Sequence, residues 1–429
     1  MAKKKQGWGE PPWKIAFRAR TGRLAFGSPR GKPDHVDVAI VGGGFAGLTA
    51  AAYVKRALGE RNGGKKSVLV LEAGRIGNGA SGRTGGMALA QSAAGDLPGL
   101  GDVLKGYKKI LRELGVAAEL DLRGVWEIAR GTRTMEGKPI RPLRNSPIDW
   151  SDSGRVRAVK LVPGGTVNPG KVAAGLARAA TKAGALIVDN ARVVRLDFGA
   201  RVSLQVEVSE GGKILKKIVT ADRVLLTTNA GAISDGSFSD GILGEKKLTF
   251  ALATASLTKK QIAALGMSSR RPFYTVDLPY LWGRMLKNRG MIFGAGLVPA
   301  FGESLPESES DKLWSGLERE DVRRGDSAER LKMLEERVRA LHPALANIRV
   351  THRWGGPILI TPGFVPVFRA HPKSKNVILL GGFSGHGVAQ SVYLGHWAAE
   401  VLLGKRGLPK WTRTGGGFSP AVMRETRTL

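Results

Sequence analysis

The sequence predicts a mixed α/β protein in which a Rossmann-like dinucleotide-binding domain is joined to a second domain rich in β-sheet. An apolar run at residues 36–41 is followed at once by Gly42-Gly43-Gly44-Phe45-Ala46-Gly47 and by a helical stretch at 48–58. A second apolar run at 67–71 ends in Glu72, and residues 248–257 and 273–296 are rich in strand-forming patterns. Strand, glycine turn, helix and second strand in this order are typical of a βαβ unit.

The first glycine cluster has the spacing of a pyrophosphate-binding turn. Gly42 permits a tight turn, Gly44 removes the side chain that would block a phosphate, and Gly47 lets helix and strand pack closely. Backbone N–H groups at the start of the following helix would face the anion, which the helix dipole favours. Glu72 lies 30 residues after Gly42, where a carboxylate accepts hydrogen bonds from ribose hydroxyls. A glycine turn without a ligand remains the alternative, but the acid and both secondary elements favour a dinucleotide.

The loop after Glu72 extends this prediction. Residues 73–87 are dense in glycine, carry hydroxyl groups and include Arg75 and Arg83, a composition too open for a helix. Small residues allow close backbone approach and arginine supplies charge for phosphate, so the loop can wrap a further length of an extended cofactor. The turn and the acid alone fit NAD and FAD equally.

A second glycine cluster, Gly381-Gly382-Phe383-Ser384-Gly385-His386-Gly387, follows an apolar strand at 376–380 and precedes an amphipathic helix at 388–403. Taken alone, this pattern predicts only a connection from strand to helix. Two further blocks also combine a turn with predicted secondary structure. Residues 162–171 lead to a helix and then to a strand at 191–196, and residues 221–231 form a strand and a turn.

Together these four blocks, in this order, resemble the FAD-dependent amine and amino-acid oxidoreductases of the D-amino-acid oxidase, glycine oxidase and sarcosine oxidase type. The resemblance is nearest to the gamma-glutamylputrescine oxidase branch and runs from about residue 34 to residue 404. It implies oxidation of a C–N bond by hydride transfer to flavin N5, with hydrolysis of the resulting imine. The electrons would then pass to oxygen, or to a quinone or carrier protein.

The resemblance also implies which residues bind FAD. The second glycine cluster is expected at the pyrimidine edge of the flavin, where the helix N-terminus stabilises negative charge on the reduced ring. The cofactor-binding candidates are Gly42, Gly44, Phe45, Ala46, Gly47, Glu72, Ala73, Arg75, Ser81, Gly82, Arg83, Thr84, Gly86, Val193, Val194, Asn229, Ala230, Gly231, Phe383, Ser384, Gly385, His386 and Gly387.

Three side chains are candidates for the catalytic site: Tyr280, Arg284 and His386. Alternation along a strand places Tyr280, Trp282 and Arg284 on one face. If that face looks toward the flavin, the aromatic rings exclude water and Arg284 clamps a carboxylate; otherwise the rings are core and Arg284 is a solvated rim residue. His386 titrates near neutrality and is a candidate proton acceptor, although shaping the turn is the alternative role.

One residue departs from the family pattern. Sarcosine-oxidase-like members place a lysine three residues after the histidine of the last motif, where it helps to hold the substrate carboxylate; this chain has Ala389. The departure favours an amine, or an amine with a distant carboxylate, over sarcosine or glycine. Trp354 is a further candidate for the pocket wall, with a place in the core as its alternative.

Composition excludes several classes of site. The chain of 429 residues contains no cysteine, which rules out disulfides, thiolate metal sites and a thioether bond to the flavin, so FAD is expected to bind without a covalent link. The six histidines show no ligand spacing, so no metal is expected. The chain has no run of 18 apolar residues, and its basic start is not followed by an apolar leader. We therefore expect a cytoplasmic protein, or one at the membrane periphery.

The net charge of +31 is unusual for such an enzyme. Basic residues crowd both ends, together with Trp8, Trp13 and Trp411, so the tails could make weak contact with a polyanion or a membrane surface. Two alternative functions follow: a flavin enzyme acting on a carboxymethylamino group of modified RNA, and a flavoprotein whose tails chiefly bind nucleic acid or membrane. Solvated tails are the plainer interpretation.

The scattered cofactor blocks predict a discontinuous organisation. We expect a basic N-terminal arm at 1–33 and a basic C-terminal tail at 405–429. The FAD-binding domain is expected at 34–97, 155–237 and 351–404, and the substrate domain at 98–154 and 238–350. Within the latter, residues 287–290 predict a hairpin turn and residues 313–341 a helix.

Overall fold

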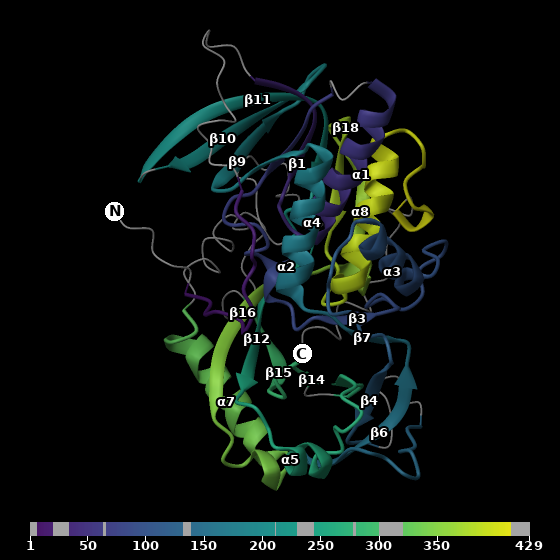
Figure 1. The fold of residues 1–429 in the computed structure, drawn as a ribbon, viewed down its shortest axis with the longest axis vertical. Coiled ribbons are helices and arrows are strands. Elements are labelled where there is room, and N and C mark those ends of the chain that lie inside the picture. Colours follow the sequence, from purple (N-terminus) through teal and green to yellow (C-terminus); the bar gives the residue numbers. More distant parts are fainter. Residues whose placement is uncertain are drawn as a thin grey trace.

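A computed structural model of the chain describes residues 7–19, 34–62, 66–131, 139–210, 212–229, 244–277, 280–299 and 321–412. In these residues the strands form two eight-stranded sheets and one two-stranded sheet. Figure 1 shows one large sheet in each half of the molecule, with most helices in the upper half. The mixed α/β class predicted from the sequence is confirmed.

The first sheet combines strands from distant parts of the chain. Its central strands are parallel: β1 (Asp34–Val41) lies between β2 (Val68–Leu71) and β11 (Lys213–Leu226), and β11 pairs with β18 (Ser374–Gly381). The carboxyl ends of these strands therefore meet at one edge, where both glycine clusters begin. The remaining strands are β8 (Leu186–Val188), β9 (Ala191–Asp197), β10 (Val202–Glu210) and β17 (Val367–His371).

Both faces of this sheet are covered because β1 is apolar on both sides. On one face Ile40 packs against the helices, and on the other face Ala39 and Val41 pack against β9 and β10. The covering helices are α1 (Phe45–Asn62), α3 (Val103–Glu113), α4 (Pro169–Ala183) and α8 (Gly387–Leu402).

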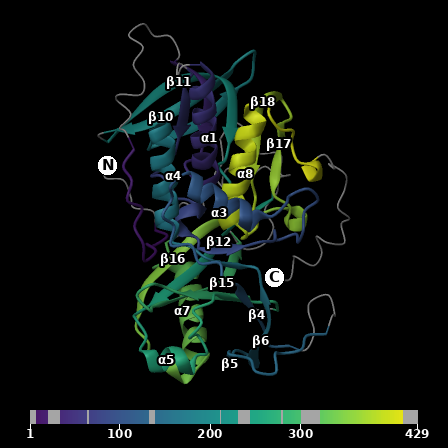
Figure 2. The ribbon, with the colours of Figure 1, turned by 45° about the vertical axis from the view of Figure 1, so that its right-hand side comes forward.

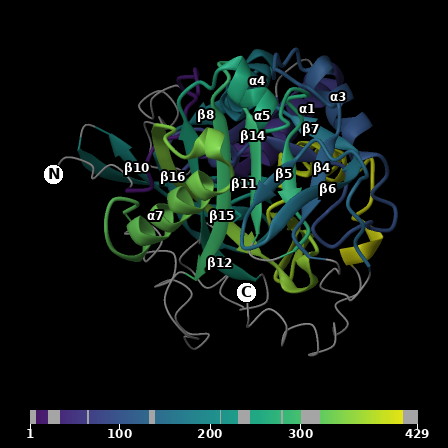
Figure 3. The ribbon, with the colours of Figure 1, turned by 90° about the horizontal axis from the view of Figure 1, so that it is seen from below.

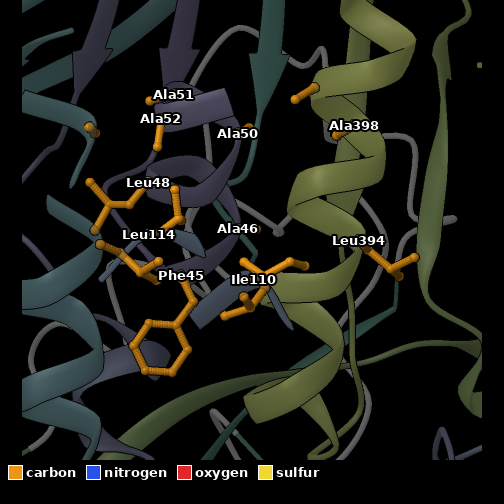
Figure 4. Close-up of a cluster of buried hydrophobic side chains, with 14 of the residues drawn as sticks. Phe45, Ala46, Leu48, Ala50, Ala51, Ala52, Ile110, Leu114, Leu394 and Ala398 are labelled. Atoms are coloured by element: carbon orange, nitrogen blue, oxygen red, sulfur yellow. The ribbon is translucent and has the colours of Figure 1, made fainter. Parts of the chain in front are cut away.

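Small residues allow α1 and α8 to approach closely. A Cβ atom on Gly395 would stand 2.5 Å from the carbonyl oxygen of Ala46. Figure 4 shows Ala46 and Ala50 on the side of α1 that faces α8, with Ala398 across from them. This packing sets the N-terminus of α1 against the middle of α8.

The second sheet has the order β16-β12-β15-β14-β13-β4-β6-β5. Its strands are β4 (Val125–Ala129), β5 (Asp149–Ser151), β6 (Arg155–Val162), β12 (Glu245–Thr254), β13 (Phe273–Thr275), β14 (Leu281–Met285), β15 (Met291–Pro299) and β16 (Val350–Ile360). The hairpin expected at 287–290 is confirmed: it joins β14 to β15, and Leu286 N donates to Gly290 O at 2.7 Å.

Two helices lie on the outer face of the second sheet, α5 (Lys259–Ala264) and α7 (Gly325–Ala340), as the view from below shows (Figure 3). Leu252 and Phe293 pack against α7, whereas their neighbours Ala251 and Ile292 pack with Trp354 on the opposite face. Residues 313–320 of the predicted helix lie outside the described residues. Short elements complete the fold: α2 (Ala80–Arg83), β3 (Met87–Leu89), β7 (Gly164–Thr166) and 3₁₀ turns at Pro343–Leu345, Pro362–Phe364 and Lys410–Thr412.

The observed sheets differ from the expected division at two places. β6 pairs with β4, and β16 pairs with β12, so both belong to the second sheet, although residues 155–162 and 351–360 were expected in the FAD-binding part. The reason is tertiary, because hydrogen bonds to distant strands decide membership of a sheet. Figure 2 shows β16 continuing the lower sheet up to the level of the first.

The tryptophans of the basic tails are packed into the protein. Trp8 is 1% exposed, Trp13 is half-buried, and Trp411 contacts Trp397 with ring centroids 5.6 Å apart. The ring of Trp8 is therefore enclosed by the protein, whereas Trp13 and Trp411 are partly exposed. Among the described residues no helix is long and apolar enough to cross a membrane, and no three His, Asp or Glu side chains cluster as metal ligands.

Candidate active site

The first glycine turn closes because two of its glycines are sterically required. Gly42 has φ +110°, and a Cβ atom there would stand 2.7 Å from both oxygen atoms of Thr227. A Cβ on Gly47 would overlap the carbonyl oxygen of Gly42. At Gly44, by contrast, the atoms near such a Cβ belong to Ser81, with Oγ at 2.9 Å. Gly42 and Gly47 thus shape the turn, and Gly44 lies at the N-terminus of α1 with only the Ser81 side chain close to its missing Cβ.

Two carboxylates lie behind this turn. Glu72 accepts hydrogen bonds from the backbone N–H of Gly43 at 2.7 Å and of Gly74 at 2.9 Å, and burial raises its pKa. Asp189, which sequence reasoning missed, accepts from Ile76 N at 3.0 Å; burial and the nearby Glu72 raise its pKa to about 6. A carboxylate has about four lone pairs, so Glu72 retains acceptor capacity for the expected ribose contact.

The two arginines of the following loop have different surroundings. Arg75 is exposed, in keeping with an arginine that could meet a phosphate. Arg83 is buried, and its guanidinium donates to the carbonyl oxygens of Gly9 at 2.8 Å, Gly355 at 3.2 Å and Asn78 at 3.0 Å. These contacts differ from the phosphate contact expected for Arg83, because a donor set occupied by carbonyl groups is not free for an anion.

The second glycine cluster is attached to the first through Asn229. Its side-chain Oδ1 accepts from Gly382 N at 2.9 Å, and its own φ of +51° marks a tight turn after β11. Thr227, two residues earlier, donates its hydroxyl to Val41 O at 3.0 Å. Residues separated by more than 300 positions therefore meet at one sheet edge. Ala230 and Gly231, also expected here, lie outside the described residues.

The start of α8 presents polar groups to this edge. His386 immediately precedes the helix, its Nδ1 lies 3.4 Å from Ser384 O, and burial lowers its pKa, so the imidazole is neutral at physiological pH. The Ser384 hydroxyl is directed to Thr361, whose backbone N–H donates to it at 3.1 Å. One turn into the helix, Ser391 Oγ is buried and no described residue hydrogen bonds to it.

A cavity of about 1100 Å³ joins these features to the second sheet. It is lined by the N-termini of α1 and α8, by residues of α2 and the turn after it, by the second sheet, and by residues of α7. Cofactor candidates that line it are Gly44, Phe45, Ala46, Ser81, Arg83, Thr84, Asn229, Phe383, Ser384, Gly385, His386 and Gly387. Candidates outside its lining are Gly42, Gly47, Glu72, Ala73, Arg75, Gly82, Gly86, Val193 and Val194.

The predicted aromatic wall lies in this cavity, but its arginine does not. Tyr280 and Trp282 line the cavity; the Tyr280 side chain is 39% exposed there, although desolvation by the cavity walls raises the pKa of its hydroxyl. Arg284 is 6% exposed, its Nε donates to Gly85 O, and its guanidinium carbon stands 5.7 Å from the centroid of the Trp13 ring. Burial lowers the Arg284 pKa to about 10, so it stays charged. Its contact is the backbone of the cofactor loop, in place of the expected substrate carboxylate.

One residue of the wall, Tyr274, was not found from the sequence. It pairs with Trp282 on the neighbouring strand, lines the cavity and donates its hydroxyl to Glu127 Oε1 at 2.6 Å. Its strand has only three residues, too few for alternation to be visible in the sequence. Trp354, a candidate for the wall with a place in the core as its alternative, lines the cavity and is also fully buried, and its indole N–H donates to Arg83 O at 2.9 Å.

The geometry agrees with comparisons to known proteins. A family model described as FAD dependent oxidoreductase matches residues 37–401. The chain belongs to this family. A gamma-glutamylputrescine oxidoreductase of Escherichia coli is 26% identical over 413 residues, covering 86% of this chain and 84% of the relative. A probable oxidoreductase, OrdL, of Rhizobium meliloti is 25% identical over 401 residues, with 86% and 83% covered.

A solved structure shares the fold. L-proline dehydrogenase from P. horikoshii superposes with a TM-score of 0.62 at 18% identity, covering 89% of this chain and 97% of the other. The chain is thus an FAD-dependent oxidoreductase of the amine or amino-acid oxidase type, as the sequence predicted.

The residues at the site fit FAD. Gly44 brings bare backbone to the cavity at the N-terminus of α1, where a pyrophosphate can approach it, and the cavity reaches from there to the N-terminus of α8. Ser391 Oγ is buried at the cavity wall without a hydrogen-bond partner among the described residues, so it can accept a hydrogen bond from a bound ligand or donate one to it. With no cysteine in the chain, a thioether link to the flavin is excluded.

Proposed function

We propose that this enzyme oxidises the C–N bond of an amine whose reacting carbon carries no carboxylate. The observation that carries the proposal is the position of Arg284: its guanidinium is buried against Gly85 O and Trp13, behind the cavity wall. Ala389 stands where related enzymes place a carboxylate-binding lysine. A buried carboxylate without a cationic partner is costly, so such a site disfavours α-amino acids.

The charged side chains that do line the cavity are consistent with this. Arg83 donates to backbone carbonyls, and Arg337 of α7 forms an ion pair with Asp152, with Nη2 and Oδ2 2.7 Å apart. Arg330 also lines the cavity, and it belongs to α7, which packs on the outer face of the second sheet. A carboxylate of the substrate that lies far from the reacting carbon could therefore meet the guanidinium of Arg330, whereas a carboxylate on the reacting carbon could not.

The aromatic wall has a direct chemical role in the proposal. Trp282, Tyr274 and Tyr280 exclude water and lower the local dielectric, which favours the neutral amine over its ammonium form. Only the neutral amine has a lone pair to donate as hydride leaves the adjacent carbon. The E. coli relative named gamma-glutamylputrescine oxidoreductase carries an amine in its name, which supports the same direction.

The remaining chemistry divides between protein and cofactor. Bound FAD supplies a two-electron acceptor at N5 for hydride from the carbon that bears nitrogen, and water hydrolyses the resulting imine. The N-terminus of α8 directs its positive dipole end into the cavity, where it stabilises developing negative charge. His386 is neutral and held near Ser384 O, so it shapes this turn, and the substrate reaches the site already deprotonated.

The test is anaerobic bleaching of the flavin by matched pairs of compounds. Butylamine against norvaline, and ethylamine against alanine, differ only in the carboxylate on the single amine-bearing carbon. We expect faster bleaching by each amine, and by putrescine, than by norvaline, alanine or glycine. Bleaching by norvaline, alanine or glycine at a higher rate than by the matched amines would refute the proposal. The readout reports hydride transfer whichever electron acceptor follows.

A further inference from the structure

The N-terminal segment 7–19 makes ordered contacts on both sides of the junction between the two large sheets. In Figures 1 and 2 it runs beside β16 and on toward α2 and α4. Its first attachment is to the second sheet. Trp8 is buried in a cluster with Leu248 and Phe250, and its carbonyl oxygen accepts from Gly355 N at 2.7 Å. The segment thereby covers the outer edge of β16.

Its second attachment is to the FAD-binding half. The indole N–H of Trp13 donates to Gly82 O at 2.8 Å, and its ring meets Trp354 edge-on with centroids 5.8 Å apart. The side chain of Ile15 packs where a Cβ on Gly82 would stand, at 2.8 Å. Arg178 of α4 donates to Ala16 O at 3.0 Å.

Arg83 ties the two attachments together. Its Nη1 donates to Gly9 O, Gly355 O and Trp8 O, and its guanidinium carbon lies 5.4 Å from the centroid of the Trp8 ring. The same side chain reaches back to Asn78 O within its own loop. A buried guanidinium with several carbonyl acceptors fixes the positions of all the segments it joins, because losing any acceptor leaves buried charge unsolvated.

The loop held in this way is the one that faces the cofactor. Residues 77–86 contain Ser81, whose Oγ accepts from Phe45 N at 3.0 Å at the start of α1, and Ser81 and Thr84 line the cavity. The loop is therefore held by α1 on the cavity side and by the N-terminal segment on the other side. A glycine-rich loop without the second support samples more conformations, and ordering it on binding weakens affinity.

We propose that residues 7–19 form a strap that positions loop 77–86 for FAD, with Trp13 and Arg83 as its positioning residues. The basic N-terminal arm, expected from sequence to be a separate tail, is in this part a component of the cofactor site. The inference concerns cofactor retention and holds whichever amine is the substrate.

The first test compares two matched substitutions. Trp13→Phe keeps an aromatic ring but removes the hydrogen bond to Gly82 O. Trp411→Phe makes the same change at a tryptophan that packs on Trp397. For Trp13→Phe we expect the FAD dissociation constant of the apoprotein to rise about three- to tenfold, the effect of one hydrogen bond. Hydrogen exchange of peptide 77–86 should be faster. Trp411→Phe should change neither.

A second variant, Arg83→Lys, tests the strap independently of Trp13. Arg83→Lys keeps the charge but cannot reproduce the fork of contacts, so it should weaken FAD binding at least as much as Trp13→Phe. At saturating FAD the Trp13→Phe variant should keep wild-type kcat and KM for an amine, which separates positioning of the loop from a role in the reaction. Wild-type FAD affinity and wild-type exchange of 77–86 in both variants, even with a lower melting temperature, would overturn the proposal.

Discussion

The glycines of the first turn offer a sharp test, because one substitution has opposite consequences at two positions three residues apart. Gly47→Ala places a Cβ atom onto Gly42 O and 2.7 Å from Thr227 Oγ1, in a turn that cannot expand. Overpacking of this kind costs about 1–3 kcal/mol, so the apoprotein should lose that much unfolding free energy. The folded state itself requires glycine here.

Gly44→Ala should behave differently. The new methyl group meets Ser81 Oγ at 2.9 Å, a contact that a small side-chain shift relieves, and Gly44 has no left-handed φ. Apoprotein stability should change by less than about 1 kcal/mol. The methyl group would stand where a pyrophosphate meets the helix N-terminus. Loss of two charge-assisted hydrogen bonds of roughly 1.5 kcal/mol each would weaken FAD binding about a hundredfold.

Two measurements separate these outcomes. Urea unfolding of the apoproteins gives the stability difference, and titration of flavin fluorescence gives the FAD dissociation constant. A Gly44→Ala protein with wild-type FAD affinity would show that the cofactor does not pass this turn. A Gly47→Ala apoprotein as stable as the wild type would show that the turn is looser than its contacts indicate.

The other predictions concern charged groups around the cavity. Arg284→Met should lower the unfolding free energy by about 1.5–3 kcal/mol and leave KM for amines unchanged; a large rise in KM at unchanged stability would return Arg284 to the role of carboxylate clamp. Asp189 is destabilising where it is ionised in the folded state, since its pKa is raised to about 6 from 3.8. Asp189→Asn should therefore stabilise the apoprotein at pH 8 but not at pH 3.5, by urea titration; equal effects at both values would contradict this. Burial lowers the His386 pKa, so His386→Asn should keep the ascending limb of kcat/KM with pH, and loss of that limb would identify His386 as the proton acceptor.

The cofactor-binding half could be predicted because its signals are local. Gly42, Gly44 and Gly47 stand at fixed spacing after an apolar strand, and the atoms that require glycine at Gly42 and Gly47 belong to the turn itself and to Thr227, directly after β11. The second cluster at residues 381–387 was equally clear once the resemblance to a family was recognised. Parallel strands then bring both clusters to one sheet edge, as the topology of such sheets requires.

Predictions for the substrate side were weaker because they depend on long-range packing. Tyr280 and Trp282 line the cavity, and alternation put Arg284 on the same face, but it could not show that Arg284 would meet Gly85 O on another segment. The period of a strand assigns a face, and the identity of the chain opposite that face is a tertiary property. Tyr274 and Ser391 were missed for the same reason.

The sequence by itself determined a dinucleotide-binding turn, because such a turn is built from consecutive residues whose conformations follow from the absence of side chains. The resemblance of four sequence blocks to a known family then indicated FAD and the type of oxidation. The absence of cysteine likewise excluded a thioether link without any structure. Only the tertiary structure decided the partners of buried charge. Arg83, Arg284 and Trp13 carry no local signal for the carbonyl groups they bind, which come from segments up to 272 residues away. Because of those contacts, Arg83 and Arg284, which were expected to bind ligands, donate to backbone carbonyl groups. Residues 7–19 of the basic N-terminal arm likewise support the loop at 77–86.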